Sequence, residues 1–136
     1  MKKFLILTAC MFGLCSPGVQ AQIKLTEKSS GRDVFRLSVP KRQTVIRYDA
    51  NDATVVGTTA RLLAEDLERV TGRAANLATG DEIVRNADVI IAGTIGKSET
   101  IDRLITRGKI RVDSITGGWE RYQIQIVKEP LPGISR

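Results

Sequence analysis

The chain has 136 residues, a net charge of +6 at pH 7, no histidine and only two cysteines. Without histidine there is no imidazole base and no common zinc or copper ligand, so only carboxylates, hydroxyls, Lys, Arg and Tyr remain as candidate catalysts. Basic residues are interspersed with acidic ones, and aromatic residues make up 4% of the chain. Since nucleic-acid binding uses basic patches with stacking aromatic groups, we expect no nucleic-acid partner.

The first 21 residues have the organisation of a secretory signal peptide. Lys2 and Lys3 precede an apolar stretch over 4–15, and small residues occupy positions 19 and 21, the latter being Ala21. The apolar stretch is shorter than the roughly 20 residues needed to span a bilayer. We therefore expect cleavage after Ala21, export to the periplasm or the medium, and no stable membrane insertion of the mature chain.

Cleavage would change the chemistry available to the mature chain. Cys10 and Cys15 would leave with the leader, so no disulfide or thiolate would remain, and loss of the two lysines lowers the net charge from +6 to +4. An alternative is lipoprotein processing with acylation of Cys10, but only six residues separate it from Lys3, which is short for the apolar segment of a signal peptide. The remainder, Gln22 to Arg136, is long enough for one domain.

After a polar lead-in over 22–33, two segments alternate apolar and polar side chains. They are Val34–Val39 and Thr44–Tyr48, and Pro40-Lys41-Arg42 separates them. Alternation predicts strands with one buried face, and the short connection predicts an antiparallel hairpin or corner.

A helix is expected next, capped by Asn51 or Asp52 and ended by Gly72. Its apolar positions recur every three or four residues, which stacks side chains on one helical face; they are Val56, Ala60, Leu63, Leu67 and Val70. Arg61, Glu65 and Arg69 are spaced by four on the outer face, as solvated ion pairs would be.

A short run over 74–78 and a polar stretch over 79–86 lead to Ala87–Ala92, which is apolar without alternation. This pattern predicts a strand covered on both faces, and we expect it to be central in the sheet. A second helix is predicted from Ser98, as N-cap, to Arg107, with Gly108 ending it. Its buried stripe would consist of Ile101, Leu104 and Ile105.

A last strand is predicted over Arg121–Val127, where apolar and polar side chains alternate again before Pro130 and Pro132. Trp119, beside two glycines, could stack on a sugar ring, but packing at the entrance of this strand is the commoner use of such a residue. Whether Trp119 or Tyr122 contacts a glycan stays open at this stage.

The stretch Gly93–Ser98, GTIGKS, has the appearance of a phosphate-binding loop between a strand and a helix. A Walker A loop needs four residues between its first glycine and the Gly-Lys pair, whereas two stand here. The required glycine position is taken by Ile91, inside the strand. We therefore interpret Gly93 and Gly96 as residues that allow a tight turn, and we expect no nucleotide partner and no cofactor.

Acidic neighbours occur at three places, but nothing indicates that they form a catalytic pair. Adjacent residues on a helix point apart, and the two carboxylates of a glycosidase must flank one bond. The sequence thus gives no catalytic, cofactor-binding or metal-binding residue. The three acidic sites are Glu65-Asp66, Asp81-Glu82, and Glu99 with Asp102.

Three segments together resemble the N-terminal domain of glycoside hydrolase family 115, the xylan α-1,2-glucuronidases. They are Asp52 to Gly72 (DATVVGTTARLLAEDLERVTG), Ala87 to Ile105 (ADVIIAGTIGKSETIDRLI) and Gly118 to Gly133 (GWERYQIQIVKEPLPG). The resemblance covers roughly Tyr48 to Gly133. It implies an α/β domain similar to the second domain of hexosaminidases, followed by a catalytic (β/α)8 barrel and by helical and β-sandwich domains.

In that family the barrel carries the acids that remove glucuronic acid, or its 4-O-methyl ether, from glucuronoxylan with inversion. The present sequence stops at Arg136 and has too few residues for a barrel of about 250, so no catalytic position of the family can be carried over. The expectation is an exported accessory domain over 34–136, incomplete at its C-terminus and inactive alone. Its partner would be the catalytic barrel of the parent enzyme, and glucuronoxylan would be the substrate of that parent.

The expected fold is α/β of the two-layer α+β kind, with a mixed sheet and two helices on one face. The alternative function is a free-standing exported module that binds an acidic glycan through Arg and Lys, with Trp119 and Tyr122 as stacking groups. Nucleotide binding is a third choice, which a nucleotide titration with Lys97→Ala as control would exclude.

Overall fold

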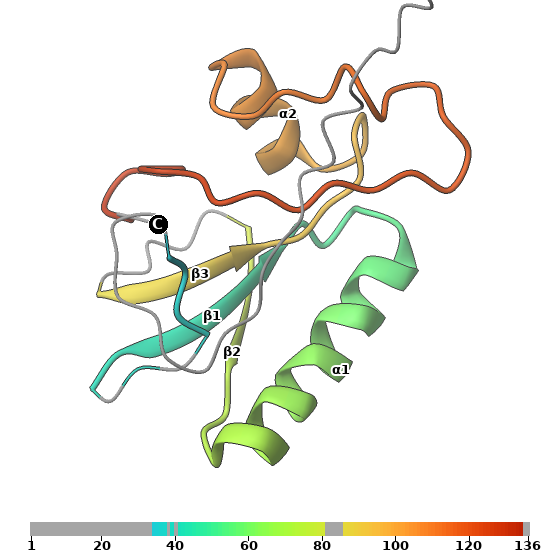
Figure 1. Ribbon diagram of the computed structural model, residues 1–136. Helices are drawn as coiled ribbons and strands as arrows, with labels where there is room; N and C mark the ends of the chain where they lie inside the picture. The colour runs from blue at the N-terminus through green and yellow to red at the C-terminus, as the bar shows by residue number, and fades with distance from the viewer. Residues whose placement is uncertain (1–33, 38, 40, 81–85, 135–136) are drawn as a thin grey trace, which may run out of the picture.

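The computed structural model describes residues 34–37, 39, 41–80 and 86–134 (Figure 1). The expected signal peptide and the polar lead-in over 22–33 lie outside the described residues, as does Asp81-Glu82. Within the described ranges, three strands and two helices follow one another, which confirms the α+β class. The elements are β1 (Gln43–Tyr48), α1 (Thr54–Thr71), β2 (Asn76–Thr79), β3 (Ala87–Ile91) and α2 (Glu99–Thr106).

The three strands form one sheet in the order β2-β1-β3, and both pairs are parallel. Ile46 of β1 lies opposite Leu77 of β2 and Ile90 of β3. The central strand is therefore β1, and the expectation that Ala87–Ala92 is central was wrong. The apolar run of β3 indicates that both faces of the strand are covered. An edge strand can also be covered on both faces, so the run does not show that β3 has a neighbouring strand on each side.

The predicted hairpin was also wrong, because none of the described residues of Val34–Val39 belongs to a strand. Both edges of β1 are hydrogen-bonded to β2 and β3, so no edge of β1 remains for an antiparallel neighbour. One contact joins the preceding segment to β1, where the Thr44 hydroxyl donates to the carbonyl of Leu37 at 2.7 Å.

Helix α1 covers one face of the sheet through Ala60 and Leu67, which pack on Ile46, a residue with 0% exposure. Its left-handed C-cap is Gly72, as predicted. Its N-cap is Ala53 without a side-chain bond, so neither Asn51 nor Asp52 caps it. Leu63 and Val70 were expected on the buried face but are exposed, Val70 by 84%. Both positions lie to one side of Ala60 and Leu67 on the helix, at the margin of the face that packs on the sheet.

The other face of the sheet is covered by the C-terminal part of the chain. Ile134, 5% exposed, packs with Val45, Ala87 and Val89, and Leu131 packs against the same cluster. In Figure 1 the segment after α2 loops back to the sheet, whereas α1 lies along the sheet and α2 is set apart from α1. In the part of the chain that the structure describes, the core therefore consists of two small apolar clusters, one on each face of the sheet.

No strand forms over Arg121–Val127, contrary to the prediction. Tyr122, Ile124 and Ile126 are 81%, 61% and 47% exposed, and among the described residues no backbone hydrogen bond joins 121–127 to the rest of the chain. The alternating pattern describes a chain that can form a strand, but a strand also needs a neighbouring backbone.

Candidate functional site

The carboxyl ends of β1 and β3 are adjacent, and the loops that follow them are tied together by Asp49. The carboxyl ends of the strands are the usual place of ligand sites in open α/β sheets. The Asp49 carboxylate accepts hydrogen bonds from the hydroxyl of Ser98 and from the amide and hydroxyl of Thr100, the last two at 2.9 Å. Ser98 and Thr100 are 0% and 1% exposed, so this cluster is a buried structural joint.

The pKa of Asp49 reflects this joint. Partial burial alone would raise it, but the hydrogen bonds from Ser98 and Thr100, together with the charge of Arg47, outweigh burial and hold the pKa of Asp49 below its usual value of 3.8. The carboxylate is thus kept ionised as a hydrogen-bond acceptor. A general acid would need the opposite shift.

The amides of the GTIGKS loop are bonded to groups within the protein. The Thr94 amide donates to Asp52 Oδ2 at 2.7 Å, and the Gly96 amide donates to Asp102 Oδ1 at 2.9 Å. The amides of Lys97 and Ser98 both donate to the carbonyl of Thr94. A phosphate would have to displace these acceptors, because all four amides already stabilise the turn.

Two glycines and one serine account for the form of this turn, as the sequence predicted. A Cβ on Gly93 would lie 2.5 Å from Ser98 Cβ, and Gly96 has φ of 75°. Ser98 is the N-cap of α2, and its hydroxyl accepts from the amide of Ile101 at 3.1 Å. The buried stripe is confirmed at Leu104, which is 3% exposed.

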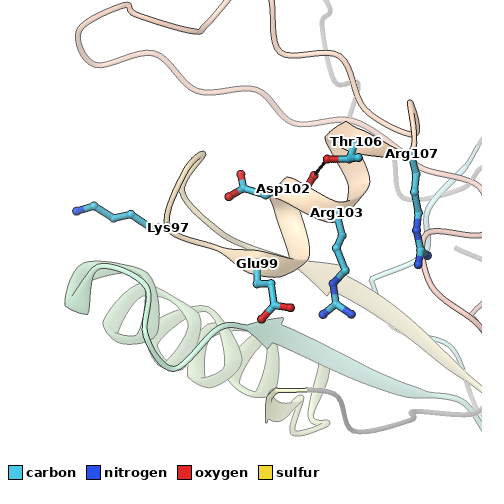
Figure 2. Close-up of a pocket in the computed structure, with 6 residues that line it drawn as sticks. All are labelled: Lys97, Glu99, Asp102, Arg103, Thr106 and Arg107. Carbon is cyan, nitrogen blue, oxygen red and sulfur yellow. Dashed lines mark hydrogen bonds between the residues drawn. The ribbon is translucent and has the colours of Figure 1, made fainter.

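A solvent-open hollow of about 380 Å³ lies over the outer side of α2 (Figure 2). Glu99, Arg103 and Arg107 extend from the helix toward one side, while Lys97 points away from the preceding loop. The Thr106 hydroxyl donates to the carbonyl of Asp102 at 2.8 Å. The lining therefore combines guanidinium groups, an ammonium group and carboxylates; it consists of Lys97, Glu99, Asp102, Arg103, Thr106 and Arg107.

The acidic neighbours considered in the sequence are placed differently by the structure. Glu65 and Asp66 are exposed on α1 and form ion pairs with Arg69, at 3.7 Å and 3.1 Å, so they act as surface pairs. Glu99 and Asp102 line the hollow. Within the described ranges, no group of three or more His, Cys, Asp or Glu residues could hold a metal ion.

Trp119 is 88% exposed, so the expectation that it packs at a strand entrance was wrong. Because Arg121–Val127 does not pair, there is no sheet face for the indole to cover. Arg121 is held differently: its guanidinium donates to the carbonyl of Ser114 at 3.1 Å, and its side chain lies against Gly118. The turn before the extended segment is thus fixed, while Trp119 and Tyr122 are left open to solvent.

Sequence reasoning missed Asp49 and the pair Arg103 and Arg107. A polar residue directly after an apolar strand was a signal for Asp49, because strand ends gather at one edge of a parallel sheet. The spacing of four between the two arginines was a signal for the hollow, because such residues lie on one side of a helix.

No protein-family model matches the chain, and no curated protein is significantly similar to it. Among the described helices, neither is long and apolar enough to cross a membrane.

Proposed function

We propose that this chain is a non-catalytic accessory domain of an exported glycoside hydrolase like the family 115 xylan α-1,2-glucuronidases. In such an enzyme a separate barrel releases glucuronic acid, or its 4-O-methyl ether, from glucuronoxylan. The accessory domain would support that barrel. The proposal rests on the three sequence segments that resemble the family and on one structural observation, the apolar surface left open on the described part of the chain.

This open surface has two parts. One is the unpaired segment with Tyr122, Ile124 and Ile126, and the other is the side of α1 where Val55 and Leu62 are 66% and 51% exposed. Monomeric soluble proteins rarely expose extended apolar patches, and such patches mark contact surfaces. An adjoining domain that covers both parts would bury these apolar side chains, which would explain why they lie outside the core of this chain.

The buried polar groups support a scaffold in preference to an enzyme. The carboxylates at the strand ends, Asp49 and Asp52, are bonded to protein hydroxyls and amides, and a depressed pKa keeps Asp49 from donating a proton to a leaving group. The carboxylates over α2 line a solvent-open hollow, where water is not excluded from a reacting bond.

Activity measurement tests the proposal. The chain, purified after export, is incubated with 4-O-methylglucuronoxylan, and released uronic acid is quantified by ion chromatography. We expect no release above the substrate-only blank, and release that scales with protein concentration would refute the proposal. The genomic sequence downstream of the Arg136 codon gives a second check, since the proposal expects an in-frame barrel there and an unrelated gene would count against it.

A second candidate, a module that binds an acidic glycan, is favoured by the exposure of Trp119 and Tyr122. Exposed aromatic rings can stack on sugar faces. Binding of the chain to insoluble glucuronoxylan, lost in Trp119→Ala and retained in the control Leu62→Ala, would support this candidate. Equal retention by all three proteins would exclude these rings as the platform.

A further inference from the structure

The segment 121–127 is held at both ends while its backbone stays open. At its start, the Arg121 guanidinium donates to the carbonyl of Ser114 at 3.1 Å. Beyond its end, the Lys109 ammonium donates to the carbonyl of Lys128 at 3.4 Å. Between these ends, no backbone amide or carbonyl is hydrogen-bonded to another described residue. An extended segment that is fixed in place with open backbone groups can pair with another strand at little cost in ordering.

We propose that this segment pairs antiparallel with the same segment of a second copy of this chain, around a two-fold axis at Ile124. In that register Ile124 meets its own copy and Tyr122 lies opposite Ile126, so the apolar side chains of both copies share one face. Gln123 lies opposite Gln125 on the other face. These two glutamines already bond to each other within one copy, at 3.1 Å, so their amides lie side by side and can exchange bonds with the second pair.

The order of side chains favours a second copy as the partner, because residues of the same kind are repeated at equal distances on either side of Ile124. A register displaced by one residue would place each isoleucine opposite a glutamine. A parallel pair in register would place Arg121 beside Arg121 of the second copy, and like charges directly opposite each other are destabilising.

The antiparallel pair also brings opposite charges together at its two ends. Arg121 lies diagonally across from the exposed Glu129 of the second copy, a position within reach of long side chains. The bond from Arg121 to Ser114 uses one guanidinium nitrogen, and the group has further N–H donors. Because the axis is two-fold, the same contact occurs twice.

The exposed apolar side chains set the strength of the association. Tyr122, Ile124 and Ile126 are 81%, 61% and 47% exposed, so pairing removes apolar surface from water. A two-stranded ribbon is marginally stable in water, and the contact is small, so we expect a dissociation constant on the order of 0.1 mM. The dilute chain is then monomeric and leaves 121–127 open. The inference goes beyond the proposed function, and an adjoining domain that covers 121–127 would compete with the second copy.

Sedimentation equilibrium of the exported chain tests the association. We expect a monomer at about 10 µM and mostly dimer at about 1 mM. Ile124→Lys should weaken the dimer at least about tenfold, because each ammonium would meet its own copy at the axis. The control is Leu62→Lys on α1, where the side chain is 51% exposed; it should leave the affinity within about twofold. A monomer at the higher concentration, assemblies that keep growing with concentration, or equal losses in both variants would overturn the proposal.

Disulfide formation between copies tests the register. The chain from Gln22 to Arg136 has no cysteine, so an introduced cysteine is its only thiol. In a glutathione redox buffer, Ile124→Cys should form covalent dimers at least about tenfold faster than Tyr122→Cys. Directly opposite Cα atoms lie about 4.5–5.5 Å apart, which suits a disulfide, whereas position 122 lies about 14 Å from its own copy.

A mixture of two variants completes the test of the register. Tyr122→Cys mixed with Ile126→Cys should give mixed dimers about as fast as Ile124→Cys alone, because these two positions lie opposite each other. Equal rates for Ile124→Cys and Tyr122→Cys alone would overturn the proposal, since a parallel pair would bring every position to its own copy. A mixture no faster than Tyr122→Cys alone would overturn it as well.

Discussion

The sheet with α1 and the segment 121–127 are built from similar apolar residues, yet they differ in what surrounds those residues. In the sheet, Ile46 and Val45 are 0% and 2% exposed, and the strand backbones are paired. In the segment, Ile124 and Tyr122 have the same alternating pattern but are 61% and 81% exposed. Alternation therefore specifies a chain capable of pairing, and the presence of a partner decides whether the side chains are buried.

The cluster of Asp49, Ser98 and Thr100 joins the loops after β1 and β3. It belongs with the sheet, the first region of this comparison, because its polar groups are hydrogen-bonded as the strand backbones are. Asp49 accepts three hydrogen bonds, and its donors are buried. In the second region the guanidinium of Arg121 donates one hydrogen bond, to the carbonyl of Ser114. We expect substitutions in the first region to affect the free energy of unfolding far more than those in the second.

The largest expected effect is that of Ile46→Ala. The side chain is fully buried between the sheet and α1, so its truncation should lower the free energy of unfolding by about 2–5 kcal/mol. The matched control is Ile124→Ala, which should change it by less than about 0.5 kcal/mol. Urea unfolding followed by far-UV circular dichroism measures both, and similar losses in the two variants would contradict the comparison.

Asp49→Ala should rank next. It would leave the hydroxyls of Ser98 and Thr100 and the amide of Thr100 without their acceptor, which we expect to cost about 2–4 kcal/mol, since each unpaired buried group costs about 1–3 kcal/mol. Asp66→Ala, which removes an exposed ion pair with Arg69, is the control and should cost less than about 1 kcal/mol. The same unfolding measurement applies, and an Asp49→Ala protein as stable as its control would argue against the joint.

The two glycines of the GTIGKS turn should respond unequally to alanine. In Gly93→Ala the added methyl group would meet Ser98 and Ile101 within 3 Å, so we expect a loss of about 1–3 kcal/mol. Gly96→Ala has open space and only the cost of a positive φ, about 1 kcal/mol. Thermal melts of the two variants test the order, and a greater loss at Gly96 would show that the close approach at Gly93 is wrong.

The smallest expected effect concerns pH. Because folding lowers the pKa of Asp49 below 3.8, the unfolded chain binds this proton more readily than the folded chain. The resulting stabilisation is complete above about pH 4 and is lost as the pH falls through the folded pKa. Stability measured from pH 5 downward should therefore fall less steeply in Asp49→Asn than in the unsubstituted protein, and parallel profiles would contradict this assignment.

The sequence was sufficient for features that depend on neighbouring residues. The cap at Ser98 and the left-handed end at Gly72 both follow from local chemistry. It was insufficient for features that join distant segments. The apolar pattern of β3 does not tell that β1 lies in the centre, and Asp49 meets Thr100 only after the two strands have paired. The hollow likewise depends on how α2 is anchored.

Amide hydrogen exchange of the exported chain tests the central claim most directly, namely that 121–127 is a strand-forming segment without a partner. We expect the amides of 121–127 to exchange at nearly the rate of an unstructured chain, while the paired amides of β1 and β3 are protected by orders of magnitude. Protection of 121–127 equal to that of β3 in the isolated chain would contradict the account, because the segment would then already have its neighbour.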